Sequence, residues 1–110
     1  MIKDIRIIPR GAGKTKWCES LRKAIPGAVM YNYYTDKMPL MHRLQGLPRN
    51  GTVTVIVDEV FSLSSNDLEH LVVALPYFDF YLAGTPMKPM HTYPKQLVSL
   101  IKQKFPEVFI

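Results

Sequence analysis

Short apolar runs alternate with amphipathic segments along the chain. Four runs rich in apolar or β-branched residues are predicted to form strands, and they cover residues 5–8, 28–33, 52–57 and 78–83. Segments whose apolar residues recur every three or four positions are predicted to form helices, at residues 14–24, 37–45, 64–75 and 94–105. The run at 52–57 is almost continuously apolar, which is typical of a strand buried on both faces of a parallel sheet.

Turn and capping residues support these boundaries. A Pro-Gly pair at 26–27 ends the first helix, and Ser64 and Asp67 have the spacing of a capping box. The alternating order predicts an α/β fold, in which helices cover both faces of a mainly parallel sheet of about four strands. We therefore expect a minimal three-layer α/β/α arrangement within one small domain, residues 1–110.

Residues 10–15, Arg-Gly-Ala-Gly-Lys-Thr, lie between the first predicted strand and the first predicted helix. A glycine-containing turn that ends in Gly-Lys-Thr at this place has the layout of a phosphate-binding loop. Backbone amides and the positive end of the helix would bind phosphate, Lys14 would reach the β- and γ-phosphates, and the Thr15 hydroxyl would ligate Mg²⁺. The predicted nucleotide-binding residues are Arg10, Gly11, Ala12, Gly13, Lys14, Thr15 and Lys16.

The full phosphate-loop pattern has a further glycine at the position of Ile8. The alternative interpretation is therefore an ordinary strand-to-helix turn with an exposed lysine. Two later segments favour the nucleotide site, because each places polar residues at the end of a predicted strand, where open α/β sheets bind ligands.

The first of these segments ends in an acidic pair. Asp58 would hold Mg²⁺ through a water molecule, and Glu59 would orient or deprotonate an attacking water. In the second segment, Thr85 follows the fourth predicted strand and would sense the γ-phosphate or the positioned water. The alternatives are that the acids begin a polar loop and that Thr85 belongs to a plain turn.

Together these motifs resemble those of viral large-terminase ATPases, the motors that package DNA. Arg10 followed by Gly13-Lys14-Thr15 resembles their variant Walker A loop, and residues 55–59 resemble their Walker B segment. Residues 84–86, Gly-Thr-Pro, resemble their coupling motif and motif III of superfamily 2 helicases. The resemblance implies an additional-strand P-loop ATPase that uses ATP and Mg²⁺, with Glu59 as the catalytic glutamate. It also implies that Arg10 either contacts phosphate or senses the nucleotide state.

The resemblance also implies a strand order, an oligomeric assembly and a cellular location. The acidic strand is expected beside the first strand, with the fourth strand on its other flank. A neighbouring subunit usually supplies an arginine in such enzymes, so a homo-oligomer or a larger viral or host assembly is expected. A viral origin would place the protein in the host cytoplasm.

Composition and charge limit the partners. The formal net charge of +5 suits a polyanion such as DNA or RNA, although the basic residues are scattered. No apolar run is long enough for a membrane span, and a lone cysteine, Cys18, fits a reducing cytoplasm.

Four tyrosines could stack on bases, but half-buried packing is the favoured expectation for them; they are Tyr31, Tyr33, Tyr34 and Tyr81.

Three functions are consistent with the sequence. The favoured one is a Mg²⁺-dependent ATPase of terminase or helicase type, with nucleic acid as a candidate partner. The second is a cut-down nucleotide-binding module that regulates a larger machine and has little or no hydrolysis. The third is a small nucleotide or nucleoside kinase, for which the sequence shows neither an arginine-rich lid nor an acceptor pocket.

Overall fold

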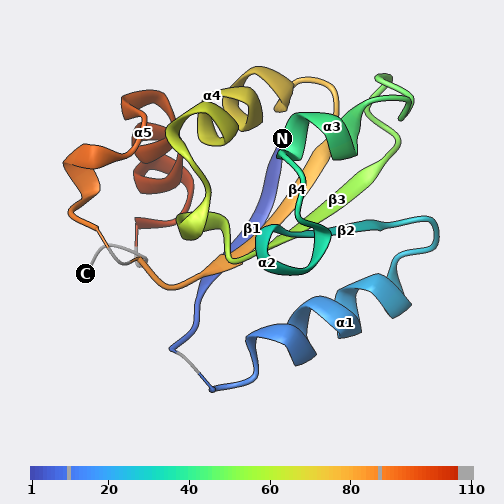
Figure 1. Ribbon diagram of the computed structural model, residues 1–110, viewed down its shortest axis with the longest axis horizontal. Helices are drawn as coiled ribbons and strands as arrows, with labels where there is room; N and C mark the ends of the chain where they lie inside the picture. Colours follow the sequence, from blue (N-terminus) through green and yellow to red (C-terminus); the bar gives the residue numbers. More distant parts are fainter. Residues whose placement is uncertain (10, 87, 107–110) are drawn as a thin grey trace.

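The computed structural model describes residues 1–9, 11–86 and 88–106, and Figure 1 shows the arrangement of its elements. Four strands form one sheet in the order β1-β4-β3-β2, and all three neighbouring pairs are parallel. The strands are β1 (Ile2–Ile7), β2 (Val29–Asn32), β3 (Thr54–Asp58) and β4 (Asp79–Gly84). The predicted α/β class and the four-stranded parallel sheet are therefore confirmed.

Helices lie on both faces of this sheet. In Figure 1, α1 covers one face, whereas α3, α4 and α5 cover the other. The helices are α1 (Lys14–Ala24), α2 (Tyr33–Asp36), α3 (Leu40–Leu44), α4 (Ser65–Ala74) and α5 (Lys95–Lys104), with short 3₁₀ segments η1 (Val60–Ser62) and η2 (Met90–Thr92). Within the described residues, no helix is long and apolar enough to cross a membrane.

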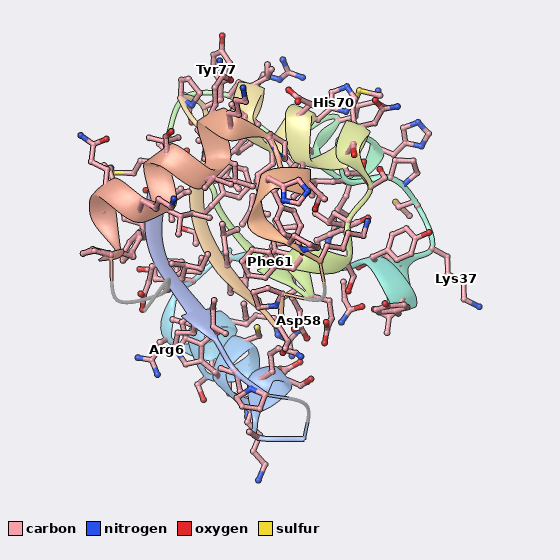
Figure 2. The ribbon with its side chains drawn as sticks, turned by 90° about the vertical axis from the view of Figure 1, so that its left-hand side faces the viewer. Arg6, Lys37, Asp58, Phe61, His70 and Tyr77 are labelled. Atoms are coloured by element: carbon pink, nitrogen blue, oxygen red, sulfur yellow. The ribbon has the colours of Figure 1, made fainter. Side chains whose placement is uncertain are left out.

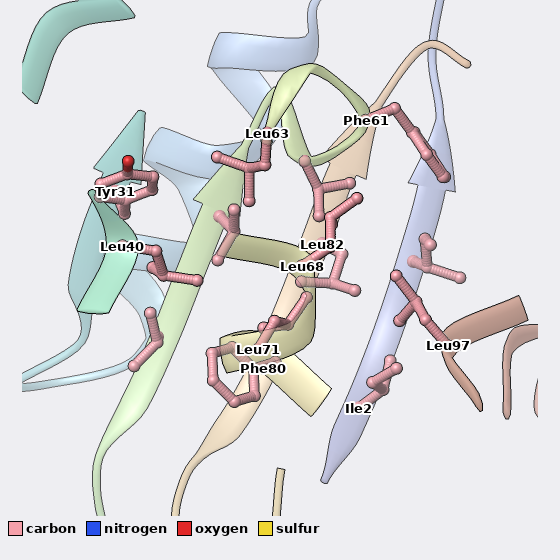
Figure 3. Close-up of a cluster of buried hydrophobic side chains, with 14 of the residues drawn as sticks. Ile2, Tyr31, Leu40, Phe61, Leu63, Leu68, Leu71, Phe80, Leu82 and Leu97 are labelled. Atoms are coloured by element: carbon pink, nitrogen blue, oxygen red, sulfur yellow. The ribbon is translucent and has the colours of Figure 1, made fainter. Parts of the chain in front are cut away.

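The sheet separates two apolar clusters because successive strand residues point to opposite faces. On the face of α3, α4 and α5, strand residues such as Val55 and Val57 pack with helix residues such as Leu71, and Figure 3 shows this cluster. On the face of α1, Ile56 packs with Cys18, which is fully buried. Burial raises the pKa of the Cys18 thiol to about 12, so the thiol stays neutral at physiological pH.

Two helices agree closely with the sequence. The first helix spans the predicted residues 14–24, and Cys18 lies buried on it. The Ser64 hydroxyl accepts a hydrogen bond from the backbone N–H of Asp67 at 3.2 Å, so the predicted cap of α4 is confirmed.

The helix expected at residues 37–45 is wrong in its bounds. Only α3 lies within it, whereas α2 is a separate helix that the sequence did not predict; Asn32 caps α2, and Lys37 ends it in a left-handed conformation with φ of 55°. Pro39 then precedes α3, and a proline disfavours helical geometry at the residue before it.

The strand order implied by the resemblance is also wrong as stated. The acidic strand β3 does not lie beside β1, because β4 is inserted between them. Burial explains this order. Three successive residues at the end of β4 and four at the end of β3 are buried, whereas β1 and β2 have fewer buried positions and lie at the edges.

Candidate functional site

The parallel sheet brings the carboxyl ends of its strands to one edge. Asp58 ends β3 and Asn32 ends β2, and the two residues pair in register. The glycine-containing turn follows β1, so it approaches the same edge before α1 begins. Figure 2 shows Asp58 at this edge, close to the start of α1.

Two glycines shape the turn. Gly11 and Gly13 have φ angles of 74° and 94°, which are left-handed values that residues with a Cβ rarely adopt. Gly13 occupies the N-cap of α1, and no side chain among the described residues caps this helix. The first amides of a helix have no intrahelical partner, so those of α1 are available to bind an anion. Arg10 lies outside the described residues.

The predicted lysine and glutamate lie in contact. Lys14 Nζ lies 2.6 Å from Glu59 Oε1, and only 8% of the lysine side chain is exposed. Glu59 itself has a φ of 58°, an unusual value for a residue with a side chain. Such backbone strain occurs often at functional sites. At this position the Glu59 side chain reaches Lys14, the first residue of α1.

Asp58 is buried and unevenly hydrogen-bonded. Its Oδ2 accepts from the Asn32 side-chain nitrogen at 3.2 Å and from Thr15 Oγ1 at 3.5 Å. Its Oδ1 is buried and has no hydrogen-bond partner among the described residues. Burial raises the pKa of Asp58 above its ordinary value, and the nearby Glu59 charge acts in the same direction. An unpaired buried carboxylate oxygen beside a threonine hydroxyl fits a hydrated Mg²⁺ ion.

The turn and Glu59 enclose a surface depression of about 650 Å³. This volume lies within the range of small-molecule binding sites. Each lining residue belongs to the predicted nucleotide site; they are Gly11, Ala12, Gly13, Lys14, Thr15, Lys16 and Glu59.

The structure gives Thr85 a local contact. Its hydroxyl donates to the carbonyl of Ile8, which ties the end of β4 to the end of β1. Gly84 is explained by close packing, because a Cβ there would lie 2.8 Å from the Phe61 ring. The structure thus brings Lys14, Thr15 and the acidic pair together, and it directs the Thr85 hydroxyl proton to the backbone.

Sequence reasoning missed Asn32 and misjudged two tyrosines. Asn32 gave no signal beyond its place at the end of a predicted strand, because its role depends on the pairing of β2 with β3. Tyr33 and Tyr34 are 42% and 56% exposed, so the packing expectation is wrong for them. It holds for Tyr31, which is buried and donates to the Met38 carbonyl, and for the half-buried Tyr81.

Comparison with known proteins does not identify this chain. No protein-family model matches it, and a search of curated proteins finds no significant match.

Proposed function

We propose that this protein binds ATP with Mg²⁺ and hydrolyses it, as a P-loop ATPase of the terminase or helicase type. The observation that carries the proposal is the convergence of four predicted side chains from two distant segments. Lys14 contacts Glu59 at 2.6 Å, and Thr15 contacts Asp58 at 3.5 Å, beside a depression formed by the glycine-containing turn.

The turn would bind the phosphates. Its left-handed glycines and the uncapped start of α1 present backbone amides, and Lys14 adds a full positive charge. Thr15 and Asp58 would hold Mg²⁺, which neutralises phosphate charge when bound.

Glu59 would orient the water that attacks the γ-phosphate. In the structure this carboxylate is paired with Lys14. Phosphate oxygens would compete for the lysine, and the glutamate would then be free to accept a proton from water. The ion pair therefore keeps both groups at the site before the substrate arrives.

The strand order departs from the one that the resemblance implies, so the proposal does not rest on it. β4 is an additional strand between the strand that precedes the turn and the strand that ends in Asp58. A parallel sheet with helices on both faces is compatible with a three-layer α/β/α fold, and the P-loop assignment is proposed from the side chains of the site. DNA or RNA, and further copies of the chain or a larger assembly, are the partners that this proposal implies.

Nucleotide titration by calorimetry tests the proposal. Wild type is expected to bind ATP more tightly with Mg²⁺ than without it. Lys14→Ala should bind about 10- to 100-fold more weakly, because a charge-assisted hydrogen bond to phosphate is lost. Glu59→Gln should retain ATP binding and lose about 100-fold or more of the turnover, because it keeps the phosphate contacts but cannot take up a proton.

Other outcomes would favour the two alternatives. Wild type that binds ATP but shows no more hydrolysis than Glu59→Gln, with or without DNA, would indicate a binding module. Phosphate transfer to an added nucleoside would indicate a kinase. Unchanged binding by Lys14→Ala would contradict the phosphate site itself.

A further inference from the structure

Asn32 connects the carboxylate of Asp58 to α2. It ends β2, where it pairs with Asp58, and it also caps α2. Its side-chain nitrogen donates to Asp58 Oδ2 at 3.2 Å, and its side-chain oxygen accepts from the backbone N–H of Tyr34 at 2.9 Å. The nitrogen of this side-chain amide is therefore hydrogen-bonded in the candidate site, and its oxygen is hydrogen-bonded to the start of α2.

The two contacts determine the orientation of this amide. In the reverse orientation, the amide oxygen would face a carboxylate oxygen and the NH₂ group would face the N–H of Tyr34. Two hydrogen bonds would then become two repulsive contacts. The backbone of Asn32 is held as well, because its N–H donates to Asp36 Oδ2 at 2.7 Å.

The Asn32 contact engages one carboxylate oxygen of Asp58 and leaves the other without a hydrogen bond. Oδ2 accepts from Asn32 and Thr15, whereas Oδ1 is buried without a partner among the described residues. A carboxylate held through one oxygen presents the other in a fixed direction. Mg²⁺ requires such order, because it demands near-octahedral geometry and depends on the groups that orient its ligands.

We propose that Asn32 is a positioning residue that holds Asp58 for Mg²⁺ and transmits the occupancy of that site to α2. The inference rests on the proposed function. A metal ion held by Asp58 would change the charge on the oxygen that accepts from Asn32, and the same amide binds the N–H of Tyr34 in the first turn of α2. This turn carries two exposed tyrosines, Tyr33 and Tyr34, whose ring centroids lie 5.5 Å apart.

Asn32→Ser separates positioning from capping. Serine caps helices about as well as asparagine, but its side chain is too short to keep the contact with Asp58. Ser64→Ala is the matched control, because it removes the cap of α4 and leaves the site residues unchanged. Calorimetry over a series of Mg²⁺ concentrations should show that Asn32→Ser needs about 10- to 100-fold more Mg²⁺ for tight ATP binding. Binding in EDTA should be unchanged, and Ser64→Ala should match wild type in both conditions.

Fluorine NMR of 3-fluorotyrosine protein measures the transmission to α2. Mg²⁺ and ATP together should shift the Tyr33 and Tyr34 signals in wild type, leave them in place in Asn32→Ser, and leave Tyr77 unchanged in both. Equal Mg²⁺ dependence of wild type and Asn32→Ser, or equal shifts of Tyr34 in both, would overturn the role of Asn32. Failure of wild type to bind ATP at all would instead overturn the proposed function.

Discussion

The carboxylate of Asp58 is buried, and neighbouring groups compensate its charge only in part. Only 2% of the residue is exposed, and one of its oxygens has no partner among the described residues. Lys14 pairs directly with Glu59, and its charge lowers the pKa of Asp58 less than burial raises it. The free-energy cost of this buried charge is consistent with a residue kept for metal binding, because function often retains groups that reduce stability.

Replacement of this carboxylate should stabilise the ligand-free protein. Because burial raises the folded-state pKa of Asp58 above its ordinary 3.8, the folded protein binds this proton more tightly than the unfolded chain does. The stabilising contribution is fully present below that ordinary pKa and is lost as the pH rises through the folded-state pKa. Asp58→Asn is expected to raise the free energy of unfolding by about 0.5–2 kcal/mol at pH 7, and by less near pH 4.

Urea unfolding without Mg²⁺ and nucleotide measures this effect at the two pH values. Asp58→Asn should also lose the Mg²⁺ dependence of ATP binding. A variant less stable than wild type at pH 7 would show that Asn32 and Thr15 compensate the charge well, contrary to this expectation.

At the scale of elements, α1 and α4 begin in opposite ways. Ser64 caps α4 with its own hydroxyl, which satisfies one of the helix's first amides. α1 begins at Gly13, and no side chain of the described residues takes that role. The contrast is consistent with different tasks, because a capped start stabilises the fold whereas an uncapped start leaves amides for a ligand.

The cap of α4 is therefore expected to contribute stability and no ligand binding. Ser64→Ala should lower the free energy of unfolding by about 1 kcal/mol, because the hydrogen bond to the N–H of Asp67 is lost. Ser65→Ala, at the adjacent exposed serine, is the matched control and should change stability by less than about 0.5 kcal/mol. Thermal and urea unfolding measure both variants, and equal losses would contradict the capping role.

On the scale of the whole molecule, exposed apolar side chains gather on one side. Apart from Met1, the large exposed apolar residues whose side chains the structure describes line one of two depressions; they are Tyr33, Tyr34, Met38, Met41, Val73 and Tyr77. Met41 and His70 line both depressions, so the two adjoin. Lys37 lines the first, and Arg49 lines the second with its guanidinium 5.9 Å from the Tyr77 ring centroid. Figure 2 shows Tyr77, His70 and Lys37 in this order along one edge.

This aromatic and basic surface is where we expect the proposed nucleic-acid partner. Single strands bind by stacking bases on aromatic rings and by pairing phosphates with basic side chains. Tyr34→Ala should weaken binding of a labelled oligothymidylate by about 1–3 kcal/mol, whereas Tyr34→Phe should retain it because the ring remains. Fluorescence anisotropy at two salt concentrations measures this without nucleotide.

A matched pair of arginines controls for charge. Arg49 and Arg6 both lie over an aromatic ring, but Arg6 pairs with Trp17 on the face of α1. Arg49→Ala should reduce the salt dependence of binding, and Arg6→Ala should not. Equal losses from both changes, or no binding by wild type, would contradict this location for the partner.

Much of the fold could be predicted because local patterns are strong. The apolar run before Asp58 and the periodic helix 14–24 depend mainly on neighbouring residues, and both occur where expected. The strand order depends on which strands are buried on both faces, and a single sequence does not show which strands will be neighbours. The helix expected at 37–45 begins only after Pro39, which was visible in the sequence, whereas the preceding helix α2 depends on the cap by Asn32, which was not.

The sequence by itself determined the α/β class, the glycine-containing turn before α1 and the acidic pair after a buried strand, because periodicity, glycine and strand ends act over a few residues. Only the tertiary structure decided that Glu59 contacts Lys14, that Asn32 binds Asp58, and that Thr85 binds the backbone just after β1. These contacts join residues from 26 to 77 positions apart, and they form only when parallel strands bring their carboxyl ends to one edge.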